Sequence, residues 1–217
     1  MFAPPDCNKF YSAGAGAGTD AFTDAMIGAV ELRELQLTEE GAVSVIRVPG
    51  GELTARTARE LDDVLGQVGE RRGPRVVLVE AGGADFCSEV APDLDTVAAG
   101  VDPPGRMEAL HIPVVVAISG HCVSAGLELA LGADVRVASP GSRLQLAEVA
   151  AGGLSRWGGV QRLTRAAGVG LATAMVLLGR EVDGATAHGA GLVHELADDP
   201  AARARAVSAE LAERGPL

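Results

Sequence analysis

The fold of this chain is decided by residues 114–163, which read VVVAISGHCVSAGLELALGADVRVASPGSRLQLAEVAAGGLSRWGGVQRL. The apolar run Val114–Ile118 is typical of a fully buried strand, and a Gly/Ser-rich turn follows it over residues 119–126. A short helical pattern carrying Glu128 comes next, and then a second strand-like run, Val135–Ala138. Strand, helix and strand in this order predict a βαβ unit in a mostly parallel sheet.

Two acidic residues stand out in this apolar stretch. Glu128 lies in the helical pattern, and Glu148 follows a loop over residues 139–143. A buried carboxylate is costly unless it is paired or functional. Each acid alone has a structural explanation: a helix cap for Glu128, although a capping box needs the acid at Leu127, and a first-turn acid for Glu148. Together they are candidates for a catalytic pair.

The composition excludes several classes of protein. The chain has 217 residues, enough for one domain with a substantial core. It carries 29 acidic and 18 basic residues, a net charge of −11, and has no positive stripe to follow nucleic-acid phosphates. Its apolar runs are shorter than the roughly 18 residues that a membrane span needs. We therefore expect neither a nucleic acid nor a membrane as a partner.

The cysteines and the N-terminus indicate a compartment. Cys7, Cys87 and Cys122 form no CxxC pair and are odd in number, which argues against a disulfide framework and against a zinc site. This usage fits a reducing environment. The first residues lack a basic segment followed by an apolar stretch, which is the pattern of a secretory signal. We expect a cytoplasmic protein without a metal.

Outside the central stretch, the chain divides into a tail and a domain. Residues 1–20, rich in Gly, Ala and Pro, predict a flexible N-terminal tail ahead of a single domain over residues 21–217. Apolar periodicity in this domain predicts strands over residues 42–48 and 75–80, and helices over residues 21–32, 54–68, 168–178, 184–191 and 200–213.

The central motifs resemble the signature of the crotonase (enoyl-CoA hydratase/isomerase) superfamily. The match lies in SGHCVSAGLELALGADVRVA over residues 119–138, in Glu148 and in GGVQRL over residues 158–163. The likeness implies an α/β fold, the crotonase-like spiral of repeated ββα units with a mostly parallel sheet. It also implies a final strand over residues 192–196. Because the sequence stops at residue 217, we expect a short member that lacks most of the family's C-terminal helices.

The resemblance also assigns roles to individual residues. Family enzymes hold a thioester carbonyl oxygen with two main-chain amides, an oxyanion hole. These donors match the amides of Ser88 and Ala125. By the same likeness, Phe86, Gly126 and Trp157 contact the substrate.

The two glutamates match the acids of family hydratases. Glu128 and Glu148 are 20 residues apart, a spacing similar to theirs. One acid of such a pair takes a proton while the other gives one. The resemblance therefore implies an enoyl-CoA hydratase-like lyase that adds or removes water across the 2,3-double bond of an acyl-CoA thioester. Two alternatives stay open: an enoyl-CoA isomerase, which needs one base, and a non-catalytic crotonase-like partner in secondary metabolism.

The same resemblance implies what the protein binds. Coenzyme A enters as part of the acyl-CoA substrate, and no separate cofactor is expected. Family members are homo-oligomers, so the likeness implies a trimer or a hexamer.

Four residues depart from the family pattern. Glu89 replaces a glycine, and its side chain either crowds the thioester or points to solvent. Asp85 stands where the family often has a basic residue, which suggests weaker binding of CoA or a protein-bound pantetheine as the acyl carrier. Arg156 and Trp157 replace small residues, and they either narrow the acyl pocket or fill the core of a chain with only 3% aromatic residues.

Overall fold

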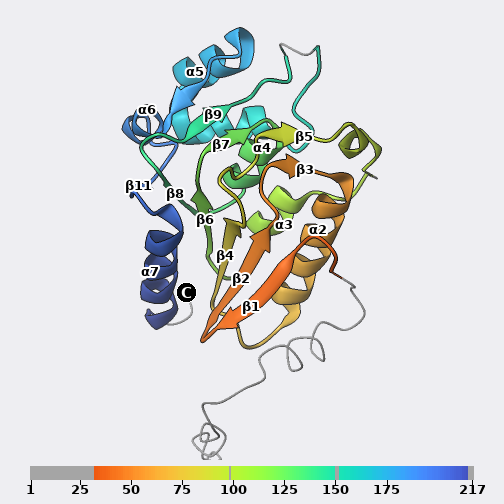
Figure 1. Ribbon diagram of the computed structural model, residues 1–217, viewed down its shortest axis with the longest axis vertical. Helices are drawn as coiled ribbons and strands as arrows, with labels where there is room; N and C mark the ends of the chain where they lie inside the picture. Colours follow the sequence, from red (N-terminus) through yellow and green to blue (C-terminus); the bar gives the residue numbers. More distant parts are fainter. Residues whose placement is uncertain (1–31, 98, 150–151, 215–217) are drawn as a thin grey trace, which may run out of the picture.

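The computed structural model describes residues 32–97, 99–149 and 152–214. The tail predicted for residues 1–20 and nearly all of the helix predicted for residues 21–32 lie outside the described residues. The described chain forms a six-stranded sheet, two smaller sheets and the helices around them (Figure 1).

The main sheet has the strand order β1-β2-β4-β6-β8-β11. Its strands are β1 (Gln36–Glu40), β2 (Val43–Val48), β4 (Val76–Ala81), β6 (Val114–Ile118), β8 (Val135–Ala138) and β11 (Glu195–Leu196). β1 runs antiparallel to β2, and all the other neighbours are parallel. The predicted mostly parallel sheet is confirmed, and the four strands predicted from apolar runs agree to within one residue at each end.

Burial along the strands follows their sequences. All five residues of β6 are buried, as its unbroken apolar run predicts for a strand covered on both faces. β4 is buried over its first five residues. In contrast, β1 (sequence QLTEE) has four exposed residues of five and forms a polar edge of the sheet.

Helices cover both faces of the main sheet. α2 (Ala55–Glu70) packs into the larger apolar core on one face, and α7 (Pro200–Glu213) lies across β4, β6 and β8 on the other. Figure 1 shows these two helices on opposite sides of the sheet. Side chains of Thr54 and Asp199 cap their first turns. Both helices were predicted from the sequence and are confirmed.

Two small sheets lie beyond the carboxyl ends of the main strands. One pairs β3 (Glu52–Leu53) with β5 (Glu89–Val90). The other has the order β10-β9-β7 and consists of β7 (His121–Val123), β9 (Arg143–Gln145) and β10 (Val182–Asp183). β3, β5, β7 and β9 follow β2, β4, β6 and β8 in the chain. These pairings fix the loops at the sheet edge where ligands of parallel α/β proteins bind.

The remaining helices are η2 (Pro92–Thr96), α3 (Pro103–Glu108), α4 (Ala125–Leu131), α5 (Gly159–Leu178) and α6 (Gly184–Gly189). The helix predicted over residues 168–178 is therefore too short at its start. α5 begins at Gly159 and continues past a kink at Gly168, where φ is 76° and ψ is 163°. A glycine with positive φ breaks the apolar periodicity, which is why the sequence indicated only the second half.

The final strand predicted over residues 192–196 is wrong in its first half. The strand that pairs with β8 is Glu195–Leu196, and the amide of His194 before it donates to the carbonyl oxygen of Arg136 in β8. The amides of Leu192 and Val193 donate instead to the carbonyl oxygen of Ala187 in α6. They complete a turn after that helix and are not available to a sheet.

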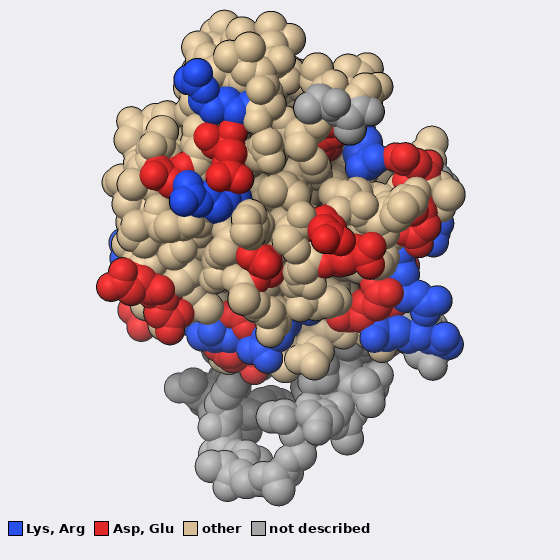
Figure 2. Space-filling view, turned by 45° about the horizontal axis from the view of Figure 1, so that its top comes forward, with Lys and Arg blue, Asp and Glu red and all other residues tan. Residues whose placement is uncertain are grey.

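The outer face of α5 is apolar. Val169, Leu177 and Leu178 are 70%, 66% and 71% exposed. Figure 2, in which the top of Figure 1 comes forward, shows few charged side chains at the top of the molecule. Among the described residues, no helix combines the length and the apolar character that crossing a membrane requires.

Candidate active site

The turn from β7 into α4 places Ala125 at the start of a helix. Ser124 precedes it with φ 50° and ψ −120°, and its amide donates to the carbonyl oxygen of Gln145 at 2.8 Å. Ala125 is fully buried. Its amide lies in the first turn of α4, where no intrahelical acceptor exists, and among the described residues it has no hydrogen-bond acceptor. The geometry therefore leaves the Ala125 amide free to bind a carbonyl oxygen.

Gly126 lets the segments before and after this turn come together. Cys87 forms a parallel bridge with Cys122, and both cysteines are buried and free. A Cβ atom at Gly126 would lie 2.2 Å from the Cβ of Cys87, so only glycine fits. Burial raises the pKa of Cys87 to about 11, which keeps its thiol neutral. The two cysteines act as small packing residues, as the sequence indicated.

The amide of Ser88 is already engaged. It donates to the carbonyl oxygen of Gly51 at 2.8 Å, and the amide of Glu89 shares this acceptor at 3.2 Å. For Ser88 to serve as the second oxyanion donor, its amide must first leave Gly51. The side chain of Glu89 points to solvent, since the residue is exposed. Phe86 is buried, and its amide donates to Ser119 at 2.8 Å.

Glu128 is completely buried on α4 and accepts three main-chain hydrogen bonds. Its Oε1 accepts from the amide of Arg156 at 3.1 Å, and its Oε2 accepts from the amides of Trp157 at 2.8 Å and Gly159 at 3.0 Å. Gly159 is the first residue of α5, and Arg156 and Trp157 lie just before its N-cap, Gly158. Glu128 therefore caps a neighbouring helix rather than its own, and its carboxylate is held in a fixed orientation.

Gly159 contacts the candidate site residue Glu128, and the sequence alone did not indicate this contact. A Cβ atom there would lie 2.6 Å from the Cγ of Glu128, so the close approach of helix and acid requires glycine. The pair of glycines in GGVQRL was the available signal, although it gives no partner for either of them.

Glu148 has a different environment. It lies in a turn after β9, so the interpretation as a first-turn helix acid is wrong: the next described helix begins at Gly159. Both carboxylate oxygens are shielded from solvent. The Ser124 hydroxyl is nearby, yet no described donor reaches either oxygen with hydrogen-bond geometry. A buried carboxylate without donors is uncommon in folded proteins.

Burial raises the pKa of both acids. At Glu128 the three amides oppose this shift, and the neighbouring charge of Glu148 adds to it, so the two acids interact. At Glu148 the nearby main-chain amide of the same residue opposes the shift, and so do the charge of Arg156 and the Ser124 hydroxyl. Two interacting acids in unlike surroundings favour different protonation states, which is the arrangement that general acid–base chemistry needs.

Arg156 and Trp157 tie this loop to the segment after β5. The indole Nε1 of Trp157 donates to the carbonyl oxygen of Val101 at 3.0 Å. The guanidinium of Arg156 forms an ion pair with Asp95 in η2. Trp157 is 7% exposed and belongs to the main core, which agrees with its core-filling interpretation. Its contact with a substrate stays a prediction.

Asp85 joins the loop after β4 to the start of β7 through hydrogen bonds. Its Oδ1 accepts hydrogen bonds from the amide of His121 at 2.7 Å and from the Nδ1 of the same residue at 2.9 Å. These bonds lower the pKa of Asp85. A Cβ atom at Gly120 would lie 2.2 Å from this oxygen, so the turn needs glycine. Asp85 thus has a structural role in the position where the family often has a basic residue.

The strained turn at Ser124 leads to a prediction. We expect Ser124→Gly to raise the unfolding free energy by about 1 kcal/mol. A non-glycine residue at such φ and ψ costs roughly 1–3 kcal/mol, and glycine removes this strain. Part of the gain is cancelled because the unfolded chain is more flexible at a glycine and loses more entropy on folding. For a chain of this size the melting temperature would rise by about 2–4 °C. Ser124→Ala, which keeps the Cβ atom, is the control, and an equal rise in both variants would contradict the strain argument.

Three comparisons relate this chain to known proteins. The model of the enoyl-CoA hydratase/isomerase family matches residues 47–217. The chain is 30% identical over 186 residues to the short-chain-enoyl-CoA hydratase of Clostridium acetobutylicum, covering 78% of this chain and 70% of the relative. It is 35% identical over 141 residues to the 2,3-dehydroadipyl-CoA hydratase of Escherichia coli, covering 63% and 55%.

A solved structure confirms the fold. The crystal structure of the enoyl-CoA hydratase from Mycobacterium tuberculosis aligns with a TM-score of 0.78 at 25% identity, over 84% of this chain and 77% of the other. The chain thus spans only part of the length of each relative, 55% in the case of the E. coli hydratase. The family match covers well over half of the chain and includes both glutamates. This chain belongs to the enoyl-CoA hydratase/isomerase family, the superfamily that its motifs resemble.

Proposed function

We propose that the protein hydrates the 2,3-double bond of an enoyl-CoA thioester, and catalyses the reverse reaction. The observation that carries this proposal is the pair of buried, interacting acids, of which Glu128 is fixed by three amides and Glu148 has no described donor. An acid without protein donors at a site is suited to exchange hydrogen bonds and protons with a substrate or a water molecule.

The surroundings of the two acids suggest their roles. Three amide donors favour the ionised form of Glu128. This carboxylate therefore accepts a proton from the attacking water while the water oxygen bonds to C3 of the substrate. Among the described residues Glu148 has no such set of donors, which favours its neutral form over the ionised one, and in the proposed reaction it gives its proton to C2. In the reverse reaction each group performs the opposite transfer.

The carbonyl oxygen of the thioester gains negative charge when water adds to C3. The free amide of Ala125 supports its role as a donor to this oxygen. Ser88 is the proposed second donor, and binding of the thioester would take its amide from Gly51. A positioned donor of this kind typically contributes about 2.7–4 kcal/mol to lowering a barrier.

One observation favours a second function. Because the amide of Ser88 is paired with Gly51, the oxyanion hole has one free donor instead of two. This would suit a non-catalytic member of the family that binds a partner protein or another copy of itself. The apolar side chains exposed on α5, among them Leu177 and Leu178, support such association and the proposed homo-oligomer.

The first test is turnover of crotonyl-CoA by the purified protein, followed as loss of the enoyl-thioester absorbance. The proposal predicts 3-hydroxybutyryl-CoA as the product. A 3-enoyl-CoA substrate distinguishes the isomerase alternative, since only an isomerase converts it to the 2-enoyl form without adding water. Absence of turnover with enoyl thioesters of several chain lengths would contradict the enzymatic proposal and favour the non-catalytic one.

A further inference from the structure

A cavity lies at the opposite edge of the main sheet from the two glutamates. It has a volume of about 440 Å³ and is lined by residues that precede β4 and β6 and by the end of α7. The acids follow the carboxyl ends of parallel strands, whereas this cavity lies at the amino ends. Strands of five or six residues separate the two sites by roughly 17 Å. The cavity therefore has no part in the proposed hydration.

Positive charge gathers around this cavity in an acidic protein. Its lining includes Arg71, Arg72, Arg75, Arg214 and His111, and no acidic residue. The chain as a whole carries a net charge of −11, so a lining with four arginines differs sharply from the average surface. A concave site lined by one sign of charge attracts ligands of the opposite sign.

Within the described chain, the four arginines of this cavity have few acidic partners. Arg71 pairs with Glu39 at 2.8 Å, but its buried Nε has no acceptor among the described residues. As far as the structure describes the chain, Arg75 donates only to a main-chain oxygen, that of Ala212, at 3.2 Å. Arg72 and Arg214 are exposed and form no ion pair within the described chain. Guanidinium groups whose N–H donors have no acidic partner can bind a carboxylate or a phosphate through two parallel hydrogen bonds.

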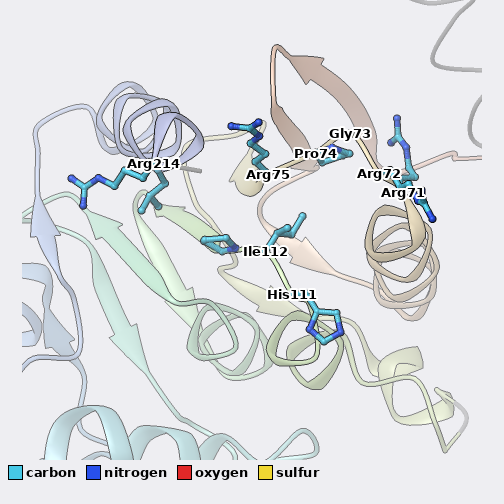
Figure 3. Close-up of a pocket in the computed structure, with 10 residues that line it drawn as sticks. Arg71, Arg72, Gly73, Pro74, Arg75, His111, Ile112 and Arg214 are labelled. Carbon is cyan, nitrogen blue, oxygen red and sulfur yellow. The ribbon is translucent and has the colours of Figure 1, made fainter. Parts of the chain in front are cut away.

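The floor of the cavity is apolar. Ile112, Pro113, Pro74 and Leu211 contribute to its lining. Figure 3 shows Ile112 in the middle of the group, with Arg214 on one side and Arg71 and Arg72 on the other. The arginine side chains point in different directions around this floor and do not meet at one point. Exposed side chains reorient on the picosecond to nanosecond timescale, so these arginines can turn toward a bound anion. The cavity volume is within the usual range for small-molecule sites, about 300–1,000 Å³.

We propose that this cavity binds an amphiphilic anion, a carboxylate or phosphate group on an apolar chain. The apolar body would lie on Ile112 and Pro113, and the anionic group would be held by Arg75 with Arg72 or Arg214. This site is separate from the one that binds the acyl thioester, and the proposal does not depend on the hydratase activity.

Calorimetric titration with octanoate and with octyl phosphate tests this inference. We expect saturable binding of at least one of them, and much weaker binding of octanol, which lacks the charge, and of inorganic phosphate, which lacks the chain. The double variant Arg72→Gln/Arg214→Gln is expected to weaken binding at least tenfold. Arg180→Gln, which removes an exposed positive charge away from the cavity, is the control and should bind as the wild type does.

Three results would overturn the proposal. The first is that neither anion binds, and the second is that the double variant binds as tightly as the wild type. The third is that saturating crotonyl-CoA displaces the anion, which would place it in the thioester site. Equal rates of crotonyl-CoA hydration in the double variant and the wild type would support the separation of the two sites. If the protein hydrates nothing, the binding experiment remains decisive, since it needs no turnover.

Discussion

A Glu148→Gln variant is expected to lose hydration activity by a factor of about 10²–10⁴, the usual contribution of a positioned general acid or base. Glutamine keeps the shape of the side chain but cannot deliver a proton to C2 of the substrate. In the proposed mechanism Glu148 transfers a proton to C2 and does not hold the thioester group, so the loss is expected mainly in kcat, with a smaller change in KM. Steady-state kinetics with crotonyl-CoA measure both.

The same variant is expected to be more stable than the wild type at neutral pH. The pKa of Glu148 is raised by burial from its ordinary value of 4.5, so the folded protein holds this proton more tightly than the unfolded chain does. The unfolded chain releases it first, and stability falls as pH rises from about 4.5 through the folded pKa. Glutamine cannot ionise and removes this loss.

Thermal unfolding at several pH values measures this effect. The melting temperature of Glu148→Gln should exceed that of the wild type at pH 7–8, and the difference should shrink below pH 4.5, where the carboxyl is protonated in both states. Glu213→Gln, at an exposed acid on α7, is the matched control and should change neither activity nor stability appreciably. A Glu148→Gln protein that is fully active, or one that is less stable at pH 7, would contradict the assignment.

The second large effect is expected from Gly159→Ala. The added Cβ atom would lie 2.6 Å from the Cγ and 3.0 Å from the Cδ of Glu128, so helix and acid must separate. Separation breaks the bonds from Gly159 and Trp157 to Oε2 and leaves buried groups without partners, at a cost of about 1–3 kcal/mol each. We expect a loss of several degrees in melting temperature and of at least tenfold in kcat.

A glycine of the same helix provides the control. Apart from its chain neighbours and the backbone of its own helix, no described atom lies within 4 Å of the position that a Cβ atom would take at Gly170, in the later part of α5. Gly170→Ala should therefore keep full activity and gain up to about 1 kcal/mol of stability from the better helix propensity of alanine. If both variants lose activity equally, activity depends on any glycine-to-alanine change in α5. The specific role of Gly159 in positioning Glu128 would then be wrong.

Much of the main sheet could be predicted, because its strands are unbroken apolar runs. β4 and β6 are buried on both faces, and a strand of that kind carries its own signal in the sequence. The strands of the small sheets carry no such sequence signal. β3, β5 and β10 have two residues each, which is too few for any periodicity. These short pairings nevertheless fix the loops of the site.

The partners of the predicted site residues could not be derived from local patterns. Glu128 binds amides that lie 28 to 31 positions later in the chain, and Arg156 reaches Asp95 over 61 positions. The pairing of the Ser88 amide with Gly51 likewise depends on two segments meeting in space. The motif resemblance identified the two acids, but only the fold distinguishes Glu128, which is fixed by three amides, from Glu148, which has no hydrogen-bond donor among the residues that the structure describes.

The central claim is that Glu128 and Glu148 catalyse the addition of water to the 2,3-double bond of an enoyl-CoA thioester. Incorporation of an oxygen isotope from water tests this claim most directly. Crotonyl-CoA is incubated with the protein in water enriched in heavy oxygen, and the mass of the thioester product is measured. The account predicts a 3-hydroxybutyryl-CoA product that carries the heavy oxygen with the wild-type protein, and a rate reduced at least a hundredfold with Glu148→Gln. Full incorporation by both proteins at equal rates, or none by the wild type, would contradict it.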